Sequence, residues 1–101
     1  MSFAERRLPI GKARKLLIEI GREDLLQKAV DTANQKYLEK PYLLSGKSGR
    51  TLLAGLIYTL LKSDRNGMPL ISQREVAEAF GCTEVSVRKS HRLWAGILGS
   101  K

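Results

Sequence analysis

The stretch Ser72–Trp94, which reads SQREVAEAFGCTEVSVRKSHRLW, decides the expected fold. It opens with the pattern of a capping box, in which a serine hydroxyl and a glutamate carboxylate each accept a backbone N–H at the start of a helix. Gly81 then allows the positive φ that ends a helix. Thr83 can cap a second helix, and Glu84 suits the first turn of that helix. The stretch therefore predicts two helices joined by a tight turn.

The same stretch has the spacing of a helix-turn-helix motif, with a small residue at Ala77 and a glycine four residues later. Ala77 has to be small because the second helix crosses close to it, and the glycine supplies the turn. We expect apolar side chains to fill the space between the two helices: Val76, Phe80, Cys82 and Val87. The motif is predicted over residues 72–98.

A helical wheel at about 100° per residue divides the second helix into two unlike sides. The side that faces the first helix carries Val87, His91, Trp94 and Leu98, with Ser90 and Ile97 at its edge. The opposite side carries Val85, Arg88, Lys89 and Arg92. No acidic residue follows Glu84, so we expect an outward face that is uniformly cationic, with one apolar residue near its start.

The outward face has residue types that contact DNA. Arginine can donate two hydrogen bonds to guanine and valine can contact a thymine methyl group, so Val85 and Arg88 are candidates for reading bases. Lys89 and Arg92 can instead bind phosphates, which gives affinity without sequence information. The alternative is a solvated charged face without a partner. We favour DNA contact because no acidic residues alternate with the basic ones and the setting is a helix-turn-helix.

Apolar periodicity predicts three further helices before this pair. The first covers residues 8–20, and the second runs over about residues 23–38. The third follows residues 45–50 and reads TLLAGLIYTLLK, which is apolar almost all round, so other helices should surround it. Within the third helix, Gly55 lets a neighbouring helix come close.

The expected fold class is therefore all-α, with a single domain over residues 8–98 built from five helices around the third. One domain also fits the length of 101 residues, which is enough for one modest core. Residues 1–7 carry no usable pattern and are predicted to be a linker or a disordered N-terminus.

Composition narrows the class of partner. Lys and Arg number 18 against 10 Asp and Glu, a formal charge of +8, which suits a polyanion such as nucleic acid. The single cysteine, Cys82, allows no disulfide within the chain and no cysteine-based zinc site, and it favours a reducing, intracellular compartment. The single histidine, His91, is expected on the inward side. We therefore expect no catalytic residue, no metal and no cofactor.

Two segments resemble a known family. ISQREVAEAFGCTEVSVRKSHRLW, residues 71–94, closely resembles the end of the second cyclin-like repeat of archaeal transcription factor B and eukaryotic TFIIB. SGKSGRTLLAGLIYTLL, residues 45–61, resembles the preceding segment of that family, which has Gly-basic-Ser-Pro and then an Ala-rich helix ending in Ile-Tyr. The resemblance covers roughly residues 8–98 and implies a five-helix cyclin fold.

The resemblance also implies a function in transcription initiation. In the family, the last helix of the second repeat enters the major groove upstream of the TATA box, where a valine and an arginine three residues later read bases. Those positions match Val85 and Arg88. The Gly-basic-Ser segment lies near the DNA backbone in the family, and its matching positions here are Lys47, Ser48 and Arg50. Gln73 and Arg74, at the start of the fourth helix, are expected to meet phosphates in a similar way.

The partners implied are double-stranded promoter DNA and TATA-binding protein, with the protein a monomer in the nucleoid of an archaeal cell or in a eukaryotic nucleus. RNA polymerase would be reached only through regions that this chain lacks, since it has no CxxC pair for a zinc ribbon and only one repeat. Gly49 stands where the family usually has proline, and Leu52 and Leu53 stand where it usually has alanines.

Two other functions fit the sequence. A cyclin-like adaptor would bind an acidic protein through the predicted helix over residues 8–20, with Lys12, Arg14 and Lys15 as its candidate face. A stand-alone helix-turn-helix regulator would bind DNA as a dimer, although only AGILGSK follows Trp94. Binding to an anionic membrane is the least favoured, because no amphipathic helix pairs a basic face with exposed aromatic residues, and we expect no membrane partner.

Overall fold

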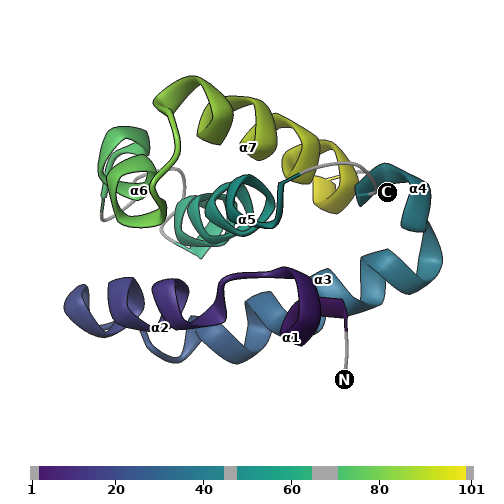
Figure 1. The fold of residues 1–101 in the computed structure, drawn as a ribbon, viewed down its shortest axis with the longest axis horizontal. Helices are drawn as coiled ribbons and strands as arrows, with labels where there is room; N and C mark the ends of the chain where they lie inside the picture. Colours follow the sequence, from purple (N-terminus) through teal and green to yellow (C-terminus); the bar gives the residue numbers. More distant parts are fainter. Residues whose placement is uncertain (1–2, 45–47, 65–70, 100–101) are drawn as a thin grey trace.

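The computed structural model describes residues 3–44, 48–64 and 71–99. The described residues form seven helical segments and no strand, so the predicted all-α class is confirmed. The segments are α1 (Phe3–Arg7), α2 (Ile10–Glu19), α3 (Leu25–Glu39), α4 (Pro41–Leu44), α5 (Gly49–Asp64), α6 (Gln73–Phe80) and α7 (Glu84–Gly99). In Figure 1, α5 lies between the α6–α7 pair on one side and α1, α2 and α3 on the other.

All five predicted helices are present, as α2, α3, α5, α6 and α7, with bounds that differ from the expected ones by a few residues. The count of five is wrong for the described residues because two short helices, α1 and α4, were not expected. A single turn such as α4 is too short to show an apolar period, and Pro41 at its start looked only like the end of the helix before it. The cyclin-like arrangement of these helices stays a prediction.

The prediction of a linker or disordered N-terminus is wrong for Phe3–Arg7, which form α1. The Phe3 ring stacks on the Tyr37 ring with centroids 4.2 Å apart. The Ala4 N–H donates to Asn34 Oδ1 at 2.8 Å, and both Phe3 and Ala4 are buried. These contacts join residues about 30 positions apart, so no local pattern could have predicted them.

Helix α5 is the centre of the core, as predicted. Every residue from Leu52 to Leu61 is buried. A Cβ built on Gly55 would overlap the Ser90 side chain, so glycine is what lets α7 lie directly against α5. Beside this approach, the Trp94 Nε1–H donates to the Leu52 carbonyl oxygen at 2.9 Å. Helix α7 is therefore held against α5 by close backbone approach and by a buried hydrogen bond.

Gly49, at the start of α5, is a second close approach. A Cβ built there would overlap the carbonyl oxygen of Arg7, at the end of α1. Proline also carries a Cβ and would meet the same overlap. The glycine at a position where the resembling family usually has proline therefore fits the way in which Arg7 packs over the start of α5.

Replacing Gly55 with Ala should lower the free energy of unfolding by about 1–3 kcal/mol, because the added methyl group forces α5 and α7 apart. The matched control is Gly11→Ala in α2, where a Cβ would meet nothing within 4 Å. That control should raise the free energy of unfolding by about 0.4–1 kcal/mol. Urea denaturation followed by circular dichroism measures both. A Gly55→Ala protein as stable as the wild type would contradict the close approach.

Candidate nucleic-acid interface

The predicted turn between α6 and α7 has the expected local structure. The Glu75 N–H donates to Ser72 Oγ at 3.2 Å and the Ser72 N–H donates to Glu75 Oε1 at 3.1 Å, so the capping box is formed. Gly81 ends α6 with φ 70° and ψ 35°, the left-handed region that favours glycine. The Ser86 N–H then donates to Thr83 Oγ1 at 3.1 Å and caps α7. The capping box therefore fixes where α6 begins, and Gly81 and the Thr83 cap fix where α6 ends and α7 begins.

Helix α7 has the two unlike sides that the wheel predicts. On its inner side, Val87, Ser90 and Trp94 are buried, with Trp94 only 1% exposed. On its outer side, Val85 is 52% exposed, one of four exposed large apolar residues in the described part of the chain. The three outward basic residues, Arg88, Lys89 and Arg92, are exposed as well. The division into a core side and a solvent side is confirmed, and contact with DNA stays a prediction.

The expectation of a uniformly cationic outer face is wrong at the first turn of α7. Arg88 Nη2 lies 3.7 Å from Glu84 Oε1, one turn earlier on the same face. Both side chains are about half exposed, and an exposed pair of this kind contributes at most about 1 kcal/mol. Arg88 can therefore leave Glu84 for another partner at low cost, while Glu84 itself would repel a phosphate.

The start of α5 lies beside this face. Ser48 and Lys89 line one shallow groove of about 270 Å³, together with Ser86. Arg50 Nη1 donates to the Gly81 carbonyl oxygen at 3.0 Å, which ties the first turn of α5 to the α6–α7 turn. Two of the three expected backbone-binding positions in this segment are thus placed next to the helix-turn-helix. The third, Lys47, lies outside the described residues.

The remaining candidates lie at the start of α6. Gln73 is half-buried, and Arg74 is exposed with its Nε 3.7 Å from Glu78 Oε1. This ion pair is exposed on both sides, at 80% and 72%, and holds Arg74 only weakly. Arg74 is therefore available for a phosphate, whereas Gln73 offers only part of its side chain.

His91 has a polar partner that sequence reasoning did not identify. Its Nδ1 lies 2.8 Å from Thr59 Oγ1, and that hydroxyl donates to the Gly55 carbonyl oxygen at 2.7 Å, so we assign the ring proton to Nδ1. The ring also meets Tyr58 edge to face, with centroids 5.1 Å apart. Burial, with a smaller contribution from Lys62, lowers the pKa of His91 below its ordinary 6.5. His91 is therefore a neutral residue that joins α7 to α5.

Cys82 is half-buried at the α6–α7 turn. Burial raises the pKa of its thiol above the ordinary 9.0, although the nearby Arg50 guanidinium acts in the opposite direction. The start of α7 therefore does not activate this thiol, and the packing role expected for Cys82 is the simpler interpretation.

Among the described residues, no group of three or more His, Cys, Asp and Glu residues could hold a metal ion. No helix among them is long and apolar enough to cross a membrane.

Comparisons with protein-family models, with curated proteins and with solved structures found no match. The likeness to transcription factor B therefore remains a prediction that rests on the residues quoted for it.

The lowered pKa of His91 predicts a pH dependence of stability. As pH falls below about 6.5, the unfolded chain binds a proton at His91 before the folded protein does, so stability falls with pH. We expect the urea midpoint to drop between about pH 7 and pH 5, and the drop to be smaller in a His91→Gln variant. The carboxyls with lowered pKa, Asp24 and Glu39, titrate at more acidic pH. If the urea midpoint dropped equally in the wild type and the His91→Gln variant, the lowered pKa of His91 would be contradicted.

Proposed function

We propose that this protein is a DNA-binding domain whose α7 enters the major groove and reads bases. The family resemblance supports a finer proposal, that the protein is a core domain of a transcription initiation factor. The domain would bind promoter DNA upstream of the TATA box together with TATA-binding protein. The observation that carries the proposal is the outer face of α7, where Val85, Arg88, Lys89 and Arg92 face solvent on the second helix of a helix-turn-helix.

The shape of α7 supports entry into a groove. It has 16 residues, so it is about 24 Å long at about 1.5 Å per residue. The major groove is about 12 Å wide and admits an α-helix. Because Trp94 and Ser90 hold the inner side against α5, the backbone of α7 would reach DNA in an already fixed position. A rigid helix of this kind loses little conformational entropy on binding.

Bases would be read at the start of α7. Val85 is exposed and can meet a thymine methyl group, and Arg88 can donate to guanine O6 and N7 after leaving Glu84. Glu84 would then face the groove floor, where cytosine N4 is a donor and phosphates are distant. The first two turns of α7 therefore present one apolar, one basic and one acidic side chain, a combination suited to bases rather than to phosphate alone.

Phosphates would be bound on the side of α7 that adjoins α5. Lys89 shares its groove with Ser48, which directly precedes the first residue of α5. A helix N-terminus favours negative charge through its free N–H groups and its dipole, and the 16-residue α5 presents one here. Arg92 extends the basic stripe one turn further along α7. The overall charge of +8 adds a long-range attraction to DNA.

Replacing Arg88 with Ala should weaken binding to a preferred site by about 1–3 kcal/mol and relax the preference at one base pair. A preferred site is first selected from random duplexes, and fluorescence anisotropy then compares it with single-base variants. Arg74→Ala is the matched control, because Arg74 also forms only an exposed ion pair. Its loss of affinity should be the same on every sequence. Sequence-independent losses in Arg88→Ala would contradict base reading by this residue.

Replacing Lys89 with Ala should weaken binding uniformly across sequences and reduce the slope of log K against log salt by about 1, because one phosphate contact is lost. Lys28→Ala is the control, since it removes the same charge from α3, which lies across α5 from α7 (Figure 1). Anisotropy between about 50 and 200 mM salt measures both slopes. If the two variants lost the same slope, the effect would be one of overall charge and the contact at Lys89 would be refuted.

A further inference from the structure

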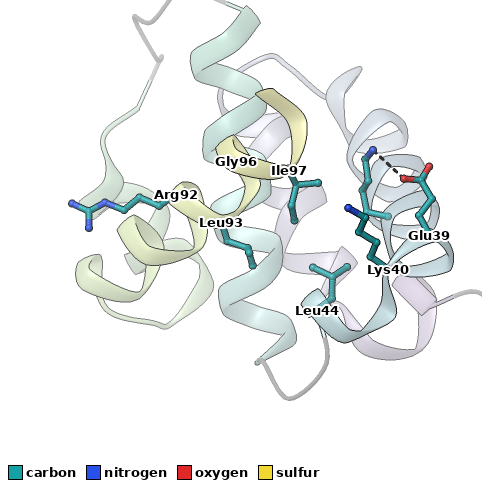
Figure 2. A pocket seen from close by; sticks show the side chains of 8 residues that line it. Glu39, Lys40, Leu44, Arg92, Leu93, Gly96 and Ile97 are labelled. Atoms are coloured by element: carbon teal, nitrogen blue, oxygen red, sulfur yellow. Dashed lines mark hydrogen bonds and ion pairs between the residues drawn. The ribbon is translucent and has the colours of Figure 1, made fainter. Parts of the chain in front are cut away.

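A groove of about 490 Å³ lies between α7 and the segment that joins α3 to α4, and the DNA proposal does not use it. Figure 2 shows its apolar floor, with Leu93 and Ile97 of α7 and Leu44 of α4 pointing into the space between the two segments. Gly96 also lines the groove and, having no side chain, leaves that part of α7 open. The volume is within the range of about 300–1,000 Å³ that is typical of ligand sites.

Basic side chains lie along the edges of this apolar floor. Lys36 and Lys40 line it on the α3 side, and Arg92 lines the α7 side and extends away from the floor (Figure 2). The one carboxylate, Glu39, is paired with Lys36, whose Nζ lies 3.3 Å from Glu39 Oε1. Within the described part of the chain, neither Lys40 nor Arg92 has an ion-pair partner. Glu39 also attracts Lys40 over a longer distance, so its single negative charge offsets only part of the charge of the three cations. The edges therefore carry a net positive charge.

We propose that this groove binds an acidic, amphipathic peptide segment of a partner protein. Aliphatic or aromatic side chains of the peptide would cover Leu44, Leu93 and Ile97, and its carboxylates would face Lys40 and Arg92. This is the helix-in-groove mode, in which residues spaced by three and four positions supply the apolar anchors. Nucleic acid fits the groove less well, because phosphates would match the edges but a sugar–phosphate backbone has nothing apolar to place on the floor.

The groove and the DNA-reading face are separate sites. The floor residues belong to none of the positions proposed for DNA, and only Arg92 is shared. A bound peptide would therefore leave Val85 and Arg88 free, and would compete with DNA at a single phosphate contact. The inference does not depend on the DNA proposal, and each can fail without the other.

The test is anisotropy with a fluorescein-labelled peptide that has Leu and Phe at helical positions i, i+3, i+4 and i+7 and Glu at most others. The blocking variant is Gly96→Phe, which puts a ring on the open part of α7. Gly96 is exposed and a Cβ there meets nothing within 4 Å, so the new side chain starts outside the core. Gly96→Ala is the matched control that keeps the groove open. We expect Gly96→Phe to raise Kd by about tenfold or more, and Gly96→Ala to leave it unchanged.

Two charge-reversal variants test whether the cations at the edges of the groove contribute to peptide binding. Lys40→Glu should weaken peptide binding and reduce its salt dependence, whereas Lys28→Glu, about three turns earlier on α3, makes the same change in total charge away from the groove and should have little effect. Two further peptides separate charge from shape. An all-Glu peptide should bind more weakly than the amphipathic one, and a version with Lys in place of Glu should not bind. Circular dichroism of every variant confirms that the helices are retained.

Several results would overturn the inference. These are equal peptide affinity in Gly96→Phe and the wild type, equal affinity for the all-Glu peptide, or no binding at about 1 mM peptide. If Gly96→Phe instead weakened binding of duplex DNA and the peptide did not bind, the groove would belong to nucleic acid. Failure of the DNA proposal looks different, because Arg88→Ala would then leave DNA affinity unchanged while peptide binding followed Gly96 and Lys40.

Discussion

The fold depends on the direct contact between α7 and α5. A Cβ at Gly55 would overlap Ser90, so the glycine leaves the space that Ser90 occupies. The Trp94 indole donates to the Leu52 carbonyl oxygen inside the core. The Thr59–His91 pair joins the same two helices about two turns after Leu52 on α5 and about one turn before Trp94 on α7. Because apolar contacts alone permit sliding, these buried polar contacts define one position of α7 on α5. No buried polar side-chain atom of the described residues is left without a hydrogen bond.

The contact between α7 and α5 determines which side chains of α7 are exposed to solvent. With Val87, Ser90 and Trp94 buried on the inner side, the 3.6-residue period of the helix leaves Val85, Arg88, Lys89 and Arg92 facing solvent. The same arrangement leaves Leu93 and Ile97 at an intermediate angle, where they form the floor of the groove together with Leu44 of α4. One buried side therefore produces two distinct surfaces. One is basic with an exposed valine, and the other is apolar with basic edges.

The features that could be predicted from the sequence are those that residues close in the chain determine. The capping box at Ser72, the left-handed Gly81 and the two sides of α7 all follow from spacing within one helix or turn. Helix α1 was missed because its contacts with Asn34 and Tyr37 are distant in sequence. The Arg88–Glu84 pair was overlooked although its i, i+4 spacing was visible. The partner of His91, the link from Arg50 to Gly81 and the groove at Gly96 all require three-dimensional packing.

The central claim is that the outer face of α7 binds promoter DNA. The most direct measurement is a gel shift of the domain on a promoter duplex that contains a TATA box, with and without TATA-binding protein. The account predicts a complex that contains the domain when TATA-binding protein is present, with protection of bases upstream of the TATA box in a footprint of the same complex. Tight binding without that protein and as a dimer would indicate a stand-alone regulator. Failure to bind in either condition would contradict the account.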